Sequence, residues 1–450
     1  MKGEKMEDEI IVAIATAQQV GAISIVRVSG TNSIAFVQKF FSGNIVNKET
    51  RTMHYGYILD DNKKIDEVLV SVFKGKKTFT GEEMVEINCH GGILITQRVL
   101  EVCLKNGASL ASRGEFSKRA FLNGRIDLSQ AEAIHDLISA KTEYTCDLAM
   151  QGLQGNIYHF ISDLQEQLIQ IITQIEVTID YPEYDDIEQL TATSLLPKSK
   201  KLQESMHKIM MDSKRVALLK EGIQTVIIGR PNVGKSSLLN ALLQEDKAIV
   251  TDIAGTTRDV VEGDIIIDDV ILHIMDTAGI RQTEDKIEQI GVDKAHSLIE
   301  KADVVFVVLD GSQPLTKEDQ QLLNSTKDKK RILIINKNDR EKCFTLEDSV
   351  SICAKNSTIQ PLIDKIKKDF YFEELLLQKR DILVNVRQRD LLHKANKSLS
   401  QAIDAMTKKV PVDLIVVELY DCWSYIKEIV GENAKEDLLD ELFKRFCIGK

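Results

Sequence analysis

The first 120 residues combine the hydrophobic patterns of strands with those of helices. Three segments, at 22–30, 66–73 and 83–90, have the density of β-branched residues that is typical of β-strands. Polar residues between two apolar runs, at 58–66, indicate a hairpin turn. The segment 91–107 then has helical spacing and ends in a glycine, as many helices do. We therefore expect a mixed α/β domain at the start of the chain.

From Leu128 onward the spacing of apolar residues becomes helical. These side chains recur three or four positions apart, at Ile134, Leu137, Ile138, Ile161, Leu164, Leu168, Ile171, Ile175 and Ile179. Pro182 interrupts the pattern because it cannot continue a helix, and a second helical stretch follows at 198–220. Helical spacing returns after about Asp381 and continues to the end, which predicts a helical domain built from two segments.

Strands alternate with helices between these two segments, which is the pattern of a parallel sheet. The strands are TVIIG, ADVVFVVLDG and RILIINKND. A complete domain can be inserted into another because domain termini often lie close together. We predict a multidomain chain that combines α/β and all-α parts. The predicted segments are 1–122 for the N-terminal domain, 123–220 and 380–450 for the helical domain, and 221–379 for the inserted domain.

Composition limits the class of protein. Lys and Arg number 58 against 69 Asp and Glu, and the resulting net charge of −11 argues against general coating of nucleic acid. The first ten residues have acids where a secretory signal would have an apolar run. No apolar stretch approaches the roughly 18 residues of a membrane span. Seven scattered cysteines without a CxxC pair suit a reducing compartment, so we expect a cytoplasmic protein that does not bind membranes.

The segment GRPNVGKSS, at 229–237, matches the phosphate-binding pattern G-x-x-x-x-G-K-[ST]. It follows a predicted strand and precedes a predicted helix, which is the setting that the motif requires. Backbone N–H groups of such a loop surround phosphate oxygens, Lys235 reaches the β- and γ-phosphates, and Ser236 binds Mg²⁺. The helix N-terminus adds its positive dipole end. These residues predict a nucleotide-binding P-loop.

Two further motifs identify the nucleotide. DTAG, at 276–279, supplies Asp276, which can hold Mg²⁺ through water, and a glycine N–H that can meet the γ-phosphate. NKND, at 336–339, places the carboxylate of Asp339 where it can accept both N–H donors on the Watson–Crick edge of guanine, a pair that adenine lacks. The three motifs in this order predict GTP. Ile280 stands where Ras-like GTPases have a water-orienting Gln, so either hydrolysis is very slow or another group positions the water.

The chain resembles the MnmE family of tRNA-modifying GTPases, also called TrmE, over nearly its whole length. The resemblance rests on the segments IVRVSG, TGEEMVEINCHGG, GEFSKRAFLNGRIDLSQAEAI, TDIAGTTRD, DTAGIR and the terminal FCIGK. The GTPase motifs are shared with many other GTPases, whereas the N-terminal segments and the terminal one are specific to the family.

The resemblance implies the function of each domain. The N-terminal α+β domain would bind tetrahydrofolate and dimerise, and a Ras-like P-loop G domain would be inserted into the helical domain. A homodimer would work with the flavoprotein MnmG, which carries FAD, in a heterotetramer-type complex on tRNA. Together they would install an aminomethyl or carboxymethylaminomethyl group at carbon 5 of the wobble uridine, using the one-carbon unit of 5-formyl- or methylene-tetrahydrofolate. GTP hydrolysis would drive the conformational cycle.

Carried over by position, the resemblance also implies the site residues. The folate would contact Arg27, Glu86, Arg125 and Lys450. Mg²⁺ would be bound by Ser236 and Thr257, and K⁺ by Asn232, Thr251, Ile253 and Thr256. The charge of K⁺ can play the part of an arginine finger, and Glu288 would orient the attacking water through a second water. The GTP-binding set comprises Asn232, Val233, Gly234, Lys235, Ser236, Ser237, Thr251, Asp252, Ile253, Ala254, Gly255, Thr256, Thr257, Asp276, Thr277, Ala278, Gly279, Asn336, Lys337 and Asp339.

This chain departs from the family pattern at several positions. Arg125 stands where many members carry Lys, which keeps the charge but not the shape. Ser112 and Arg113 replace an Arg-Pro pair. Cys353 replaces the Ser of the Ser-Ala-Lys loop beside the base, with little expected cost because a backbone N–H does most of that work. Tyr420 takes a place often held by Arg, with no consequence that we can assign.

The terminal segment FCIGK is predicted to dock rather than to fray. It follows a helical stretch whose apolar residues are spaced to bury one face, at Leu438, Leu439, Leu442, Phe443 and Phe446. Gly449 would let the backbone pass close to a ligand, and Lys450 would offer charges near the one-carbon carrier. Cys447 joins Glu288 as a catalytic candidate, as a nucleophile or acid with a lowered pKa. A small buried hydrophobic side chain is the equally weighted alternative for this thiol.

A different class of function shares the same G motifs. An Era-like or Der-like GTPase would gate an assembly such as a ribosomal particle without modification chemistry. Such a protein would more often carry a KH-type RNA module with a G-x-x-G loop in a basic context, and the sequence shows none. Basic runs at 198–201 and 327–331 are candidates for tRNA docking, although such runs are usually solvated surfaces. The tRNAs served, the choice of ammonium or glycine as donor and the stoichiometry with the partner stay open.

Overall fold

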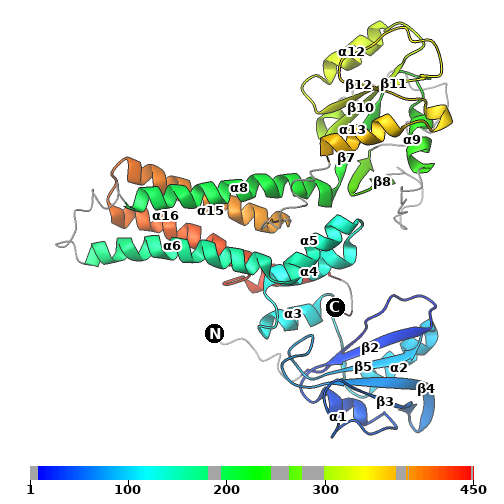
Figure 1. Cartoon of the computed structure of the whole chain (residues 1–450). Helices are drawn as coiled ribbons and strands as arrows, with labels where there is room; N and C mark the ends of the chain where they lie inside the picture. The colour runs from blue at the N-terminus through cyan, green and yellow to red at the C-terminus, as the bar shows by residue number, and fades with distance from the viewer. Residues whose placement is uncertain are drawn as a thin grey trace. The chain divides into compact units, whose positions relative to one another are not determined.

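The structure is a computed structural model, which describes residues 9–180, 194–244, 263–275, 298–370, 382–383, 385–446 and 449. The chain divides into two compact units (Figure 1). The first comprises Met1–Ser139, Met150–Gln203 and Leu391–Lys450, and the second comprises Ala140–Ala149 and Glu204–Asp390. The domain boundaries given above stay predictions. In the described part of the chain, no helix has the length and apolar character needed to cross a membrane.

The N-terminal domain is built on a six-stranded sheet in the order β3-β4-β5-β2-β1-β6, antiparallel except where β1 pairs with β6. Its strands are β1 (Ile11–Ile14), β2 (Ile23–Ser29), β3 (Thr52–Asp60), β4 (Lys63–Phe73), β5 (Met84–His90) and β6 (Ser109–Leu110). The predicted hairpin turn lies between β3 and β4, where Asp61 and Asn62 both have positive φ (46° and 68°). Two-residue hairpins favour such conformations because they match the twist of the strands.

Helices cover one face of this sheet. Apolar side chains of α1 (Ser33–Gln38) and α2 (Ile93–Lys105) share a buried core with inward-facing residues of β1 to β5. On the opposite face, α3 (Glu115–Leu122) places Phe116 against Ile11 of β1. Tyr55 of β3 and Leu69 of β4, which are paired across the ladder, remain exposed on that opposite face. The sheet is therefore closed at the β1 end and open over β3 and β4.

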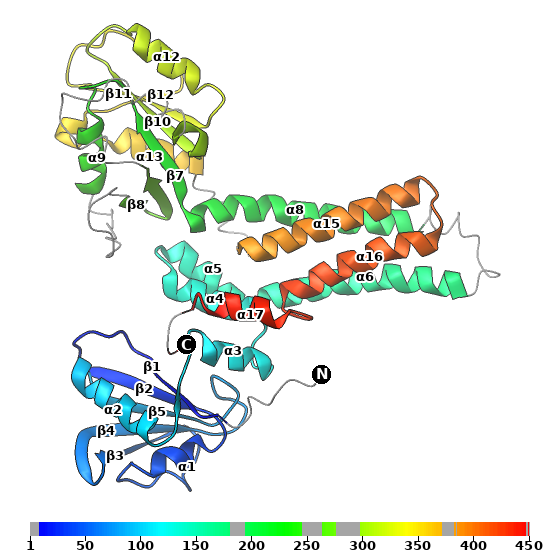
Figure 2. The same ribbon diagram turned by 180° about the vertical axis from the view of Figure 1, so that it is seen from behind.

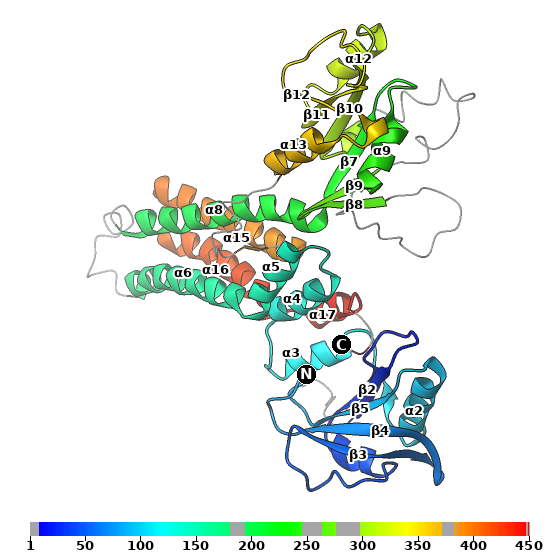
Figure 3. The ribbon, with the colours of Figure 1, turned by 45° about the vertical axis from the view of Figure 1, so that its right-hand side comes forward.

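The helical part of the first unit follows the predicted spacing, with two exceptions. Its helices are α4 (Leu128–Ser139), α6 (Asn156–Asp180), the start of α8 (Leu196–Glu221), most of α15 (Val386–Thr407), α16 (Val412–Ile429) and α17 (Glu436–Phe443). Figure 1, Figure 2 and Figure 3 all draw α6 along α16. Ile138 and Ile179 were expected in the apolar stripe but are 45% and 40% exposed. Both lie in the last turn of their helices.

The second unit contains a sheet in the order β12-β11-β10-β7-β9-β8. Its strands are β7 (Ile223–Ile228), β8 (Gly263–Ile267), β9 (Val270–Ile274), β10 (Val304–Asp310), β11 (Arg331–Asn336) and β12 (Ser349–Ser351). The ladders are parallel, as predicted, except between β8 and β9. Only Asp268 and Asp269 separate those two strands, and so short a connection joins antiparallel strands. α9 (Lys235–Gln244) and α13 (Gln360–Phe370) pack on one face and α12 (Lys317–Ser325) on the other.

The second unit also includes the start of α5 (Glu143–Leu153), although this helix precedes the G domain by some 70 residues of sequence. Tyr144 is buried in the core formed by β7 to β12, and Leu148 packs against the same core. The backbone N–H of Tyr144 donates to Asp269 Oδ1 at 3.2 Å, and Lys141 forms an ion pair with Asp264. Burial raises the pKa of the Tyr144 hydroxyl to about 12. The N-terminal half of α5 is thus part of the α/β domain core.

Candidate functional site

The P-loop has the strand–loop–helix setting that its sequence predicts. β7 ends at Ile228, and α9 begins at Lys235. Within the loop, Asn232 and Gly234 have positive φ (63° and 98°). A Cβ on Gly234 would lie 2.2 Å from Nδ2 of Asn336. Glycine is required at this position both by the backbone conformation and by the close approach of the base-binding motif.

Lys235 lies across the loop that it follows. Its Nζ donates to the carbonyl oxygens of Gly229 at 2.8 Å and Arg230 at 3.0 Å. Burial lowers the pKa of this ammonium, because desolvation disfavours the charged form. Ser236 and Ser237 occupy the first turn of α9, next to the positive end of its dipole. The loop therefore has the strand–loop–helix setting of a P-loop, and the binding of phosphates by Lys235 and of Mg²⁺ by Ser236 stays a prediction.

Asn336 joins the base-binding motif to two other segments. It is the last residue of β11 and is buried. Its Nδ2 donates to the carbonyl oxygen of Val233 at 2.8 Å, and its Oδ1 accepts from the backbone N–H of Ala354 at 3.0 Å. Because the amide uses both ends, Asn336 fixes the distance between the P-loop and the loop that contains Cys353. Asp339, three residues further along, is exposed and accepts a hydrogen bond from the Cys353 thiol, with 3.3 Å between Sγ and Oδ1.

Asp310 holds Lys337 and was missed by the sequence analysis. Lys337 has positive φ (65°), and its Nζ pairs with Asp310 Oδ2 at 2.6 Å. Burial alone raises the pKa of Asp310, but the hydrogen bonds from Lys337 and Ser312 outweigh it and hold this pKa below its ordinary value. The sequence did contain a signal for Asp310, because this acid ends an otherwise apolar strand. In a parallel sheet, the end of that strand lies at the same edge as the P-loop.

Asp319 of α12, which the sequence analysis also missed, forms an ion pair with Arg230 of the P-loop. Arg230 Nε lies 3.2 Å from Asp319 Oδ2, and Asp319 is nearly fully buried in the capping box at the start of α12. Arg230 also donates from Nη2 to Gln313 Oε1 at 3.2 Å. The first contact ties the loop to α12, and the second ties it to the segment between β10 and α12.

Much of the predicted phosphate and ion site lies outside the described residues. This applies to Thr251, Asp252, Ile253, Ala254, Gly255, Thr256, Thr257, Asp276, Thr277, Ala278, Gly279 and Glu288. Of the predicted ion ligands, Asn232 and Ser236 are described, and both lie in the P-loop region. Within the described residues, no cluster of three His, Cys, Asp or Glu side chains is arranged to hold a metal ion.

A second candidate site lies in the N-terminal domain, where Arg27 of β2 is paired across the ladder with Glu86 of β5. Nε and Nη2 of Arg27 lie 3.0 Å and 2.9 Å from Glu86 Oε1. The guanidinium also lies 5.0 Å from the ring centroid of Phe79 and 5.7 Å from that of Phe116. Nη1 donates to the backbone carbonyl of Gly449 at 3.1 Å. The structure therefore brings the terminal segment to two of the four predicted folate residues.

Gly449 can occupy this place only because it has no side chain. Its φ is 89°, and a Cβ would lie 2.4 Å from the carbonyl oxygen of Ile14 and 2.9 Å from Cα of Ala15. The preceding residues are anchored by Leu439, Phe443 and Phe446, which pack against α4. Cys447 and Lys450 lie outside the described residues, so their predicted roles remain untested.

Arg125 contacts the segment between β4 and β5 that also contains Phe79. It is exposed, and its Nε donates to the carbonyl oxygen of Thr78 at 3.3 Å. Thr78 precedes Phe79, whose ring faces Arg27. Two of the predicted folate-binding cations, Arg27 and Arg125, thus contact the segment between β4 and β5.

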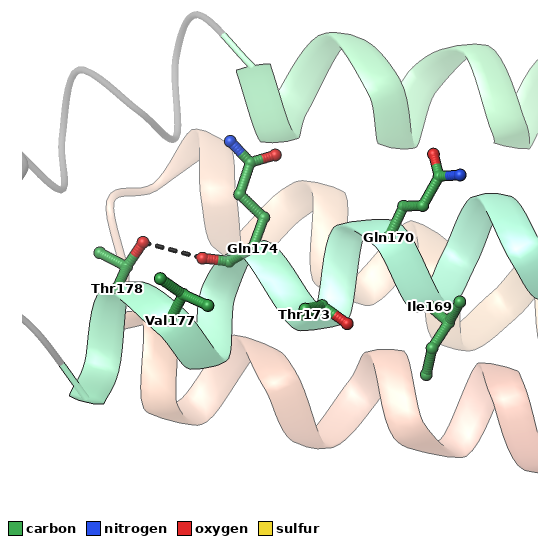
Figure 4. A pocket seen from close by; sticks show the side chains of 6 residues that line it. All are labelled: Ile169, Gln170, Thr173, Gln174, Val177 and Thr178. Atoms are coloured by element: carbon green, nitrogen blue, oxygen red, sulfur yellow. Dashed lines mark hydrogen bonds between the residues drawn. The ribbon is translucent and has the colours of Figure 1, made fainter.

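A shallow groove lies on α6. It is lined by Ile169, Gln170, Thr173, Gln174, Val177 and Thr178 (Figure 4). Thr178 donates to the carbonyl oxygen of Gln174 at 2.8 Å, as Figure 4 shows. Gln174 Oε1 accepts from Lys198 Nζ at 3.0 Å. The groove follows the contact between α6 and α8 and contains none of the predicted site residues.

The fold and the two sites define the class of this protein. A P-loop between β7 and α9 and a guanine-binding motif at the end of β11 are the elements of a GTPase domain, here combined with an N-terminal α+β domain and a helical domain.

Comparisons with known proteins identify the family. The family model for the MnmE helical domain matches residues 128–447, and that for the GTP-binding protein TrmE N-terminus matches residues 10–125. The tRNA modification GTPase MnmE of Lactococcus lactis subsp. cremoris (strain MG1363) is 44% identical over 450 residues, covering 99% of each chain. That of Streptococcus pyogenes serotype M4 (strain MGAS10750) is 45% identical over 453 residues, also covering 99% of each. The G domain of the T. maritima FeoB iron transporter is similar at 24% identity over 32% of this chain and 97% of that one, with a TM-score of 0.25.

This chain belongs to the MnmE family of tRNA modification GTPases. The resemblance stated from the sequence is confirmed, as are the multidomain fold class and the assignment of GTPase activity.

Proposed function

We propose that this chain is a K⁺-stimulated GTPase that works with the flavoprotein MnmG. Together they install an aminomethyl or carboxymethylaminomethyl group at carbon 5 of the wobble uridine in tRNA, in the cytoplasm. The observation that supports this proposal most is the contact of Gly449 with Arg27 beside Glu86. A chain that used GTP only as an assembly switch would have no need to hold its terminal segment over a charged site in a separate domain.

The residues of the N-terminal site fit a folate. A tetrahydrofolate has an anionic glutamate tail and a pterin with N–H donors, which suit a guanidinium and a carboxylate respectively. A guanidinium carries five N–H donors, and the described contacts of Arg27 use three nitrogens without exhausting them. Phe79 adds a ring that a planar pterin can contact. The folate would supply the one-carbon unit, and Arg27, Glu86, Arg125 and Lys450 would bind and orient it.

In the G domain, the proposal assigns the ions to the predicted ligands. Ser236 and Thr257 would bind Mg²⁺, which would neutralise charge on the phosphates. Asn232 with Thr251, Ile253 and Thr256 would hold K⁺, and Glu288 would position the attacking water through a second water. Asn232 lies in the loop between β7 and α9, three residues before Lys235.

We propose that the chain forms a homodimer through the open face of the N-terminal sheet. Met53, Tyr55 and Leu69 are 59%, 58% and 43% exposed on neighbouring strands, which is a contiguous apolar surface. Leu69→Glu should convert the dimer to a monomer in multi-angle light scattering. Leu414→Glu, which changes a leucine on α16 that is 59% exposed, is the control and should leave the mass unchanged.

The decisive experiment is mass spectrometry of the wobble uridine in tRNA from a strain that lacks this gene. Loss of the C5 substituent, restored by the wild-type gene, is expected. Unchanged tRNA together with an accumulation of immature ribosomal particles would instead support the assembly-factor alternative.

A further inference from the structure

Three residues close a ring of hydrogen bonds at the end of β2. Ser29 Oγ donates to Glu82 Oε2 at 2.9 Å, and it also lies 2.7 Å from Oγ1 of Thr80. The backbone N–H of Glu82 donates to Oγ1 of Thr80 at 3.3 Å. Ser29 and Thr80 are both fully buried. The ring therefore ties the segment between β4 and β5 to the strand that contains Arg27.

The hydrogen bonds of this ring have one consistent direction. Glu82 also pairs with the buried guanidinium of Arg119, with 3.4 Å between Nη1 and Oε2, and an ionised carboxylate only accepts hydrogen bonds. The single hydroxyl proton of Ser29 therefore points to Glu82, and the hydroxyl of Thr80 must donate to Ser29. Because each hydroxyl accepts once and donates once, the bonds strengthen one another. Removing either hydroxyl opens the whole ring.

The ring fixes the backbone next to Phe79. Thr80 follows Phe79 directly, and its carbonyl oxygen accepts from Nδ2 of Asn123 at 2.8 Å. Both polar groups of Thr80, the hydroxyl and the carbonyl, thus have a partner outside their own residue. The ring centroid of Phe79 lies 5.0 Å from the guanidinium carbon of Arg27, within the range of a cation–π interaction. The place of the aromatic ring on Arg27 therefore depends on how Thr80 is held.

We propose that Thr80 and Ser29 are positioning residues for the N-terminal site. Their hydroxyl groups hold the ring of Phe79 against the Arg27 guanidinium, in the arrangement that a folate meets when it binds. Neither side chain touches the ligand, since both are fully buried and both hydroxyls are used within the ring. Their effect on binding passes through Phe79. The inference rests on the proposed folate-binding function of this site.

The first test is the affinity of the full-length protein for 5-formyltetrahydrofolate, measured by calorimetry. Thr80→Val removes the hydroxyl but keeps the shape of the side chain, and it should weaken binding about tenfold, the size expected for one hydrogen bond. Ser29→Ala opens the same ring from β2 and should have a similar effect. Thr80→Ser keeps the hydroxyl and should bind like the wild type. A serine variant as weak as the valine variant would overturn the role of the hydroxyl.

Thr96→Val is the matched control. Thr96 is another buried threonine of the N-terminal domain, and its hydroxyl donates to the carbonyl oxygen of Gly92 at 2.9 Å. Both valine variants lose a buried hydrogen bond and should melt at a lower temperature, but only Thr80→Val should lose affinity for the folate. An equal loss of affinity in both variants would assign the effect to reduced stability and would overturn the proposal.

A double-mutant cycle with Phe79→Leu tests whether Thr80 acts through Phe79. Leucine keeps an apolar side chain but has no aromatic face for the guanidinium. In the Phe79→Leu background, Thr80→Val should weaken binding no further, and additive losses would refute the positioning role. A wild type that does not bind 5-formyltetrahydrofolate would refute the folate function itself. Equally tight binding by the wild type and Thr80→Val would refute only the role of Thr80.

Discussion

Substituting alanine for Gly449 should detach the terminal segment from the N-terminal domain while leaving the GTPase domain intact. The new Cβ would have to fit 2.4 Å from the carbonyl oxygen of Ile14 and 2.9 Å from Cα of Ala15, both backbone atoms of β1 and the residue after it. Neither atom can move aside without disturbing the ladder between β1 and β2. The terminal segment must therefore move instead.

The cost of this substitution has two parts. A residue with a Cβ pays about 1–2 kcal/mol for a left-handed conformation such as the φ of 89° at this position. Relieving the contact with Ile14 also lengthens the 3.1 Å bond from Arg27 Nη1 to the Gly449 carbonyl, and a bond to a charged donor is worth about 1.5–3 kcal/mol. Together these terms reach about 3 kcal/mol, which lowers the equilibrium constant for docking roughly a hundredfold.

Two assays follow the two consequences. Hydrogen–deuterium exchange should become faster in the peptide that contains residues 444–449, and the C5 modification of wobble uridine should fall in cells that depend on the variant. GTP hydrolysis should be unchanged. Gly75→Ala is the matched control, since Gly75 of the N-terminal domain also has positive φ (78°), but a Cβ there would meet nothing within 4 Å.

The reasoning fails if Gly449→Ala exchanges as slowly as the wild type, because the segment would then tolerate a Cβ in its place. Faster exchange with normal tRNA modification would refute a different step, namely the need for docking in the proposed function. Reduced modification in Gly75→Ala to the same extent would show that the effect comes from backbone strain in general.

Three further outcomes are expected. GTP hydrolysis should be faster in K⁺ than in Na⁺ at equal ionic strength, and Asn232→Ala should remove the difference; equal turnover in both salts would exclude the ion from the mechanism. Glu288→Ala should slow hydrolysis by roughly 10² with GDP affinity unchanged, and a normal rate would return Glu288 to an ordinary surface role. Asp310→Asn should lower the free energy of unfolding at neutral pH by about 2 kcal/mol, and with it the melting temperature, because it breaks the ion pair with Lys337. The pKa of Asp310 is depressed in the folded state, so its contribution to stability is present above the ordinary carboxyl pKa and is lost as pH falls. The melting temperatures of the wild type and Asp310→Asn should therefore converge in acid. A difference in melting temperature that stays constant with pH would contradict this sign.

The elements that the sequence predicted well are those fixed by local patterns. The P-loop could be placed between β7 and α9 because a buried strand, a glycine-rich loop and a helix start follow one another within 20 residues. The turn at Asp61 and Asn62 could be predicted because these residue types tolerate positive φ. The apolar stripe of α6 was correct along its length and wrong only at Ile179, in the last turn of the helix.

Contacts between distant segments could not be predicted from such patterns. Nothing in the neighbourhood of Arg27 indicates that a carbonyl 422 positions later accepts its hydrogen bond. In the same way, Asp310 and Lys337 are brought together by the parallel register of β10 and β11, which no single segment encodes. The terminal segment was assigned to the N-terminal site through resemblance to a family, and the contact with Gly449 gives that assignment a physical basis.

The presence of Tyr144 in the core of the second unit has a practical consequence for dissecting this protein. A fragment cut at the sequence boundaries of the G domain, 221–379, would lack Tyr144 and Leu148 and would leave their apolar neighbours facing water. It would also leave Asp264 without the cation of Lys141. GTPase kinetics measured on such a fragment would describe a domain with an incomplete hydrophobic core. A fusion that restores residues 140–149 is the fragment whose turnover can be compared with that of the intact chain.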